Sequence, residues 1–157
     1  MSYCPPSAVL PADERLRADR LGWFQRTAMI AGGTVLISLL IVAAVLRPNP
    51  RGMGTHRQLG LPPCSMVVLA GIRCPSCGMT TSWSRVMRGN LVGAVRANSG
   101  GTLLALAAIA SGPWLVVSGL AGRWKFCCPD ERTLVWIGLI IIAVTLIDWT
   151  LRLKLGL

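Results

Sequence analysis

Three long runs with almost no charged residue constrain the fold of this chain more than any other feature of its sequence. Residues 27–46 and 97–122 contain no Asp, Glu, Lys or Arg, and residues 133–151 contain a single charged residue, Asp148. The hydrocarbon core of a bilayer is about 30 Å thick, and a helix needs roughly 20 residues to cross it. The sequence therefore predicts three transmembrane helices, at about residues 27–46, 101–121 and 133–151.

The composition agrees with a protein embedded in a bilayer. Hydrophobic residues make up 53% of the 157 residues, charged residues make up 14%, and the mean hydropathy is +0.58. The first run is expected to remain as a span, because it starts too late for a signal peptide and leads into Arg47-Pro48 instead of a small-residue cleavage site. We predict an all-α membrane protein with three transmembrane helices, a cysteine-bearing loop between helices, and short interfacial helices.

A chain of this length is expected to form one domain. Its first residues are rich in proline and arginine, which predicts a flexible basic segment before the first span. The expected organisation has three parts: a flexible basic N-terminal arm at residues 1–26, a single membrane domain at residues 27–151 with the cysteine loop at 47–98, and a short tail at 152–157.

The net charge of +10 comes from 16 Lys and Arg residues against 6 Asp and Glu residues. Most of these basic residues flank the spans, so we expect them to contact the anionic headgroups of the lipid bilayer and not nucleic acid. Seven basic residues lie in the arm and second loop, whereas nine lie in the first loop and tail. By the positive-inside rule this small excess favours the cytoplasmic side for the cysteine loop, where thiols stay reduced.

The first loop contains a Cys-Pro-Ser-Cys-Gly turn at residues 74–78, with Cys64 ten residues upstream. Two thiols separated by two residues can bind one metal ion, and a glycine after the second thiol lets backbone N–H groups approach the thiolates. A tetrahedral zinc or iron site needs four ligands. Cys64, Cys74 and Cys77 supply three, and His56 is the candidate for the fourth.

Two other interpretations of these cysteines stay open. In a redox protein, Cys74 would be the attacking thiolate and Cys77 the resolving thiol. The βαβ pattern that supports such a motif in soluble proteins is absent from this sequence. Alternatively, the cysteines are small apolar residues that pack where the loop meets the membrane helices.

Short helices are expected in the same loop. Ser65 to Ile72 is an apolar stretch too short to cross a membrane, so we expect it to dip into the interface. Thr80 or Thr81 is expected to cap a helix that runs to about Arg88, and Asn90 is expected to cap the next one.

Two further features lie outside the loop. Asp148 lies four residues before Arg152, which predicts an ion pair near the end of the third span. The neighbouring Cys127 and Cys128, in the second loop, are candidates for lipid attachment or simple packing.

The first loop resembles an uncharacterised bacterial family of small membrane proteins. The residues that carry the resemblance are Cys64, Gly71, the Cys74-to-Thr80 segment, Arg88-Gly89-Asn90, Ala94 and Asn98. The family is marked by a Cys-Pro-x-Cys-Gly-x-Thr loop, an Arg-Gly-Asp/Asn turn, and an Ala…Asn-Pro stretch that enters a membrane helix. Here Thr81 stands where the family commonly has Arg, and Ser99 stands where it commonly has Pro.

The resemblance implies an integral protein of the bacterial inner membrane and assigns no reaction. Together with the residue patterns, it indicates an accessory or structural protein instead of an enzyme. Other membrane-protein subunits are the expected protein partners. The cysteine loop would then be either a packed element or a zinc or iron knuckle, with thiol–disulfide exchange at Cys74 and Cys77 as the alternative.

Overall fold

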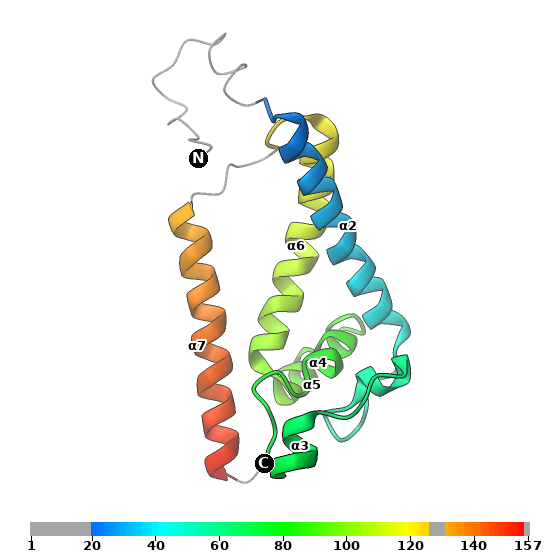
Figure 1. Ribbon diagram of the computed structural model, residues 1–157, viewed down its shortest axis with the longest axis vertical. Coiled ribbons are helices and arrows are strands. Elements are labelled where there is room, and N and C mark those ends of the chain that lie inside the picture. Colours follow the sequence, from blue (N-terminus) through cyan, green and yellow to red (C-terminus); the bar gives the residue numbers. More distant parts are fainter. Residues whose placement is uncertain (1–19, 126–130, 156–157) are drawn as a thin grey trace.

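The computed structural model describes residues 20–125 and 131–155 of the chain, and within them the fold is helical (Figure 1). Three long helices form the body of the molecule: α2 (Trp23–Val45), α6 (Ser99–Ala121) and α7 (Glu131–Leu155). Four short elements lie between α2 and α6: η1 (Thr55–Leu59), α3 (Ser65–Ala70), α4 (Met79–Val86) and α5 (Leu91–Ala97). This arrangement confirms the predicted all-α class and the cysteine-bearing loop.

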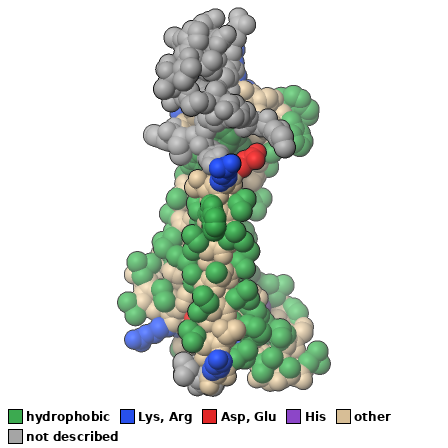
Figure 2. Space-filling model, turned by 90° about the vertical axis from the view of Figure 1, so that its left-hand side faces the viewer, with side chains coloured by type: hydrophobic (Ala, Val, Ile, Leu, Met, Phe, Trp, Pro, Cys, Tyr) green, Lys and Arg blue, Asp and Glu red, His purple; other side chains and the backbone are tan. Residues whose placement is uncertain are grey.

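All three predicted spans are confirmed as helices long and apolar enough to cross a membrane. The first begins at Trp23, four residues before the predicted start, and the third extends beyond both predicted ends. Figure 2 shows the face on which α7 lies, where hydrophobic side chains cover the long middle and basic ones lie near the ends. Such a distribution suits a bilayer whose headgroups meet the charged ends. The predicted division into arm, domain and tail stays a prediction.

Glycines let α2 and α6 pack closely along their length. A Cβ atom added to Gly33 would lie 2.7 Å from Val116 Cγ2 and 2.8 Å from the carbonyl oxygen of Gly112. A Cβ atom on Gly119 would similarly lie 2.7 Å from Ile30 Cγ1. Small residues are the usual means of bringing membrane helices together, because lipid supplies no hydrophobic force between them. These glycines therefore set the α2–α6 contact.

Helix α4 is inserted into the end of this pair, between the end of α2 and the start of α6 (Figure 1). Its apolar side chains join a buried cluster with residues of α2, α5 and α6: Leu40, Ala43, Trp83, Val86, Ala94, Ala105 and Ala108. Two of its buried hydroxyls find acceptors at the residues that cap the long helices: Ser84 donates to the carbonyl of Leu46 at 2.6 Å and Ser82 to that of Asn98 at 3.2 Å. These hydroxyls are thus satisfied, as a low-dielectric interior requires, whereas the buried indole N–H of Trp83 has no hydrogen-bond partner among the described residues.

The caps of the short helices match the predictions in part. The Asn90 side chain accepts a hydrogen bond from the Gly93 N–H at 2.8 Å, which confirms the cap of α5. The predicted Thr80 or Thr81 cap of α4 is wrong, because Gly78 occupies the cap position with a φ of +90°. Thr81 instead lies fully buried, and its hydroxyl is 2.7 Å from that of Thr55.

Helix α7 is tied to the rest of the chain at its C-terminal end by polar contacts. Asp148 and Arg152 form the predicted ion pair at 2.9 Å. Asp148 also accepts a hydrogen bond from the Ser99 N–H, at 3.3 Å, and Arg152 donates to the carbonyl of Ala97 at 2.8 Å. The indole of Trp149 donates to the carbonyl of Arg73 at 2.6 Å. These bonds hold α7 against the start of α6 and against the residue before Cys74.

Cys127 and Cys128, the candidates for lipid attachment or simple packing, lie outside the residues that the structure describes.

Candidate metal centre

A tight turn brings Cys74 and Cys77 together. The Cys77 N–H donates to the carbonyl of Cys74 at 3.0 Å, and the two sulfur atoms lie 3.1 Å apart. The next residue, Gly78, has a positive φ that allows the chain to leave the turn directly into α4. The local sequence therefore builds a turn that presents both sulfurs on one side.

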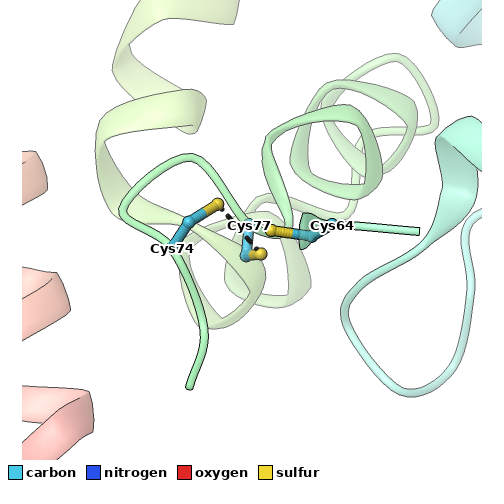
Figure 3. A group of neighbouring side chains, drawn as sticks. All are labelled: Cys64, Cys74 and Cys77. Atoms are coloured by element: carbon cyan, nitrogen blue, oxygen red, sulfur yellow. Dashed lines mark hydrogen bonds between the residues drawn. The ribbon is translucent and has the colours of Figure 1, made fainter. Parts of the chain in front are cut away.

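Cys64 reaches the same point from a separate segment, at the start of α3 (Figure 3). The sulfur atoms of Cys64, Cys74 and Cys77 all lie within 4.8 Å of one another, and all three side chains are partly exposed. The structure thus brings together the three cysteines that the sequence singled out.

The spacing of the sulfurs suits one shared transition-metal ion. Zinc–thiolate bonds of about 2.3 Å at tetrahedral angles place neighbouring sulfurs about 3.8 Å apart. The sulfurs of Cys74 and Cys77 lie 3.1 Å apart, and no two sulfurs of the group are more than 4.8 Å apart, so their separations lie near that value. Small side-chain rotations would equalise them, so the three residues could hold one metal ion.

His56 is not part of this three-cysteine group. Its ring Nε2 lies 3.2 Å from the carbonyl oxygen of Pro62. However, His56 and the three cysteines line one cavity of about 680 Å³ at the end of α2. Its role as the fourth ligand stays a prediction.

Two of the thiols differ in acidity in the metal-free protein. The backbone N–H of Val67, in the first turn of α3, is the main cause that lowers the pKa of Cys64 to about 7, and the thiols of Cys74 and Cys77 add to it. Partial burial is the main cause that raises the pKa of Cys77 to about 12. Cys64 is therefore about half ionised near neutral pH, whereas Cys77 stays protonated until a cation arrives.

We expect this difference to appear as a pH dependence of alkylation. In the reduced, metal-free protein, the rate of Cys64 modification by iodoacetamide should rise with pH and reach half its maximum near pH 7, because only the thiolate reacts. Cys77 should remain slow throughout the neutral range. Mass spectrometry of the modified peptides measures both rates, with the unfolded protein as the control. A Cys64 midpoint at or above that of unfolded thiols, about 8.5, would contradict this expectation.

Asn98, the residue just before α6, supports the cysteine turn through hydrogen bonds. The sequence alone did not predict this role. Its side-chain N–H₂ donates to the carbonyls of Pro75 at 2.9 Å and Cys77 at 3.2 Å. Its side-chain oxygen accepts from the Gly101 N–H at 2.6 Å, which caps α6. The residue is 3% exposed, so these bonds are made away from water. Asn98 thereby joins the cysteine turn to a membrane helix.

Replacing Asn98 by alanine should destabilise the protein by about 2–3 kcal/mol, because a helix cap and two bonds to partly buried carbonyls are lost together. Amide hydrogen exchange of residues 74–78 should also become faster. Asn90→Ala is the matched control, since Asn90 caps α5 without contacting the cysteine turn. We expect that variant to lose only about 1 kcal/mol and to leave exchange in the turn unchanged. Equal effects of the two variants on the turn would be evidence against the assigned role.

A second buried contact, at the start of α4, was also missed. Thr81 pairs with Thr55, whose hydroxyl oxygen accepts from the Asn49 N–H at 3.0 Å. This pair holds the segment after α2 against α4 and so shapes the cavity beside the cysteines. The sequence marked Thr81 as unusual, because the family that the chain resembles commonly has arginine there. Nothing in the sequence indicated that its partner is Thr55.

Residues 64–112 match the model of a family described as a protein of unknown function (DUF2752). The matched segment includes the three cysteines, α4, α5 and the first half of α6. This match fits the uncharacterised family that the sequence resembled. No curated protein and no solved structure matched the chain.

Proposed function

We propose that this chain, whose residues 64–112 match a domain of unknown function, is an integral membrane accessory protein that holds one zinc or iron ion through Cys64, Cys74 and Cys77. The observation that carries the proposal is the convergence of three sulfurs within 4.8 Å from two separate segments. Thiolates are the ligands that zinc and iron sites of this kind prefer.

The charge around the cysteines supports a thiolate-rich centre. Three thiolates bound to a divalent cation leave a net negative charge, which nearby positive groups stabilise. Arg51 and Arg57 line the same cavity as the cysteines, and no acidic side chain is among the described residues that line it. The fourth ligand would come from His56, from water or from a partner protein.

A structural role follows from where the three ligands lie. Cys64 is the N-cap residue of α3, whereas Cys74 and Cys77 lie in the turn that precedes α4. A shared ion would join these segments and fix the shape of the loop at the membrane surface. The loop would then present a rigid surface to other membrane-protein subunits. This role needs no catalytic step, which agrees with the expectation that the protein is not an enzyme.

Metal analysis of the full-length protein, purified in detergent under reducing conditions without chelators, tests the proposal. We expect about one equivalent of zinc or iron in the wild type and its loss in Cys74→Ser, because a three-ligand site loses most of its affinity with one thiolate. Ser76→Ala is the control, since it removes the hydroxyl that lies 3.2 Å from the Cys74 sulfur but leaves all three thiols in place. A wild-type protein without metal, or a Cys74→Ser variant that retains it, would overturn the proposal.

Thiol–disulfide exchange at Cys74 and Cys77 is the alternative, and the 3.1 Å between their sulfurs is what supports it. Disulfide formation would shorten that separation to about 2.05 Å and would require an external oxidant to accept two electrons. Thiol trapping in intact cells separates the two proposals. A pair that is always reduced and metal-bound favours the metal centre, whereas a pair that cycles favours exchange. Membrane-impermeant labels applied from each face would test the proposed cytoplasmic location of the loop.

A further inference from the structure

A second cavity, distinct from that of the cysteines, is surrounded by arginines. Its volume is about 730 Å³, which lies within the usual range for ligand sites. Four arginines from three segments line it: Arg51 after α2, Arg85 in α4, Arg88 after α4, and Arg96 in α5. None of the described residues that line this arginine groove is acidic.

Two of these arginines are held in place by backbone and hydroxyl groups instead of by carboxylates. Arg85 donates to the carbonyls of Gly93 at 2.7 Å and Asn49 at 3.2 Å, so it joins α5 to the segment after α2. Arg88 donates to the carbonyl and the hydroxyl of Ser84, at 3.1 and 2.8 Å. These neutral acceptors fix the guanidinium groups without neutralising their charge.

The other two arginines leave their charge available. Arg51 and Arg96 are exposed, and within the described part of the chain their guanidinium groups have no hydrogen-bond or ion-pair partner. Four like charges around one concave surface raise the local positive potential and favour an anion that occupies it. A planar guanidinium matches the oxygen atoms of phosphate especially well, through paired N–H donors.

The position of the groove indicates which phosphate it would meet. The groove lies where α2 ends, between the turn at residues 48–52 and the short helices α4 and α5. The end of an apolar span is the depth at which lipid headgroups lie. A phosphate group carried by a lipid is therefore present at high local concentration, whereas a free phosphate would have to come from solution.

We propose that the arginine groove is a specific site for the phosphate-bearing headgroup of an anionic membrane phospholipid. This goes beyond a general attraction between basic residues and the membrane, because it assigns binding to one preformed group of four arginines. It assigns no role to the candidate metal ligands, since Cys64, Cys74 and Cys77 do not line the groove; of the four arginines, Arg51 alone also lines the cysteine cavity.

The test uses the full-length protein in detergent, with phosphatidylglycerol as the anionic lipid and phosphatidylcholine as the zwitterionic one. Native mass spectrometry should show phosphatidylglycerol retained by the wild type in preference to phosphatidylcholine, and the same lipid should raise its melting temperature. The double variant Arg51→Gln, Arg96→Gln should bind phosphatidylglycerol roughly tenfold to thirtyfold more weakly, at about 1 kcal/mol per interfacial charge. These two side chains make no described bond, so the substitutions should leave the fold in place.

Arg123→Gln, Arg132→Gln is the matched control, because it removes the same charge from the other end of the long helices. We expect this variant to bind phosphatidylglycerol as the wild type does. An equal loss in both double variants would show general charge attraction and would overturn the proposal. Wild-type protein without preference for the anionic lipid would also overturn it, as would equal stabilisation by millimolar inorganic phosphate.

Discussion

Replacing Gly78 by alanine is expected to disrupt the three-cysteine group more severely than any other single methyl group added to the loop. Gly78 has a φ of +90°, which residues with a side chain rarely adopt. A Cβ atom there would lie 2.8 Å from the carbonyl oxygen of Gly52 and closer still to that of Ala97. Both obstacles are backbone atoms, so neither can rotate away. The turn would have to move away from Gly52 and from Ala97 at the end of α5, and Cys77 would move with it.

We expect Gly78→Ala to lower the free energy of unfolding by about 3 kcal/mol or more, from backbone strain and steric overlap together. The metal content should fall with it, because Cys77 directly precedes Gly78 in the chain. Thermal unfolding in detergent and metal analysis measure the two effects on the same sample.

Gly71→Ala is a sharp control for this prediction. Gly71 also has a positive φ, of +66°, but an added Cβ atom there would meet nothing within 4 Å. This variant carries the backbone strain without the overlap, and we expect it to lose only about 1–2 kcal/mol and to keep its metal. If the two variants behave alike, the close approach of the turn to Gly52 and Ala97 does not determine the site.

The second large effect is expected at the contact between α2 and α6. Gly33→Leu would place a side chain where the Cβ atom alone lies 2.7 Å from Val116 Cγ2 and 2.8 Å from the carbonyl oxygen of Gly112. The two helices would have to separate, which removes packing along their whole contact. We expect the free energy of unfolding, measured with sodium dodecyl sulfate, to fall by about 3 kcal/mol. Helix α4 should also be displaced from the end of the α2–α6 pair.

The adjacent residue supplies the control for the helix contact. A Cβ atom on Gly32 would meet nothing within 4 Å, because this residue faces away from α6. Gly32→Leu should therefore change stability by less than about 0.5 kcal/mol. The two glycines are neighbours in one apolar run, so only the packing of α2 on α6 distinguishes them. Similar losses in both variants would contradict the observed α2–α6 contact.

Several features of the fold could be predicted because they depend on local sequence. Uninterrupted apolar length identified the three spans, since a bilayer demands about 20 such residues. The Asn90 cap and the Asp148–Arg152 pair followed from spacings of three and four residues along a helix. Within the candidate site, the Cys74–Cys77 turn was predictable for the same reason. The Thr80 or Thr81 cap failed because Gly78 could take a backbone conformation that begins α4 earlier.

What the sequence determined by itself was therefore the class of protein, its spans and the identity of its candidate ligands. Only the tertiary structure decided that Cys64 meets the turn while His56 stays outside the group, and that Asn98 bonds the turn. The tertiary structure also decided that four arginines from three segments surround one groove. The physical reason is that helix periodicity relates residues within one or two turns, whereas these contacts depend on how α2, α4 and α6 pack. That packing is set by glycine contacts and buried hydroxyl bonds between segments far apart in the chain.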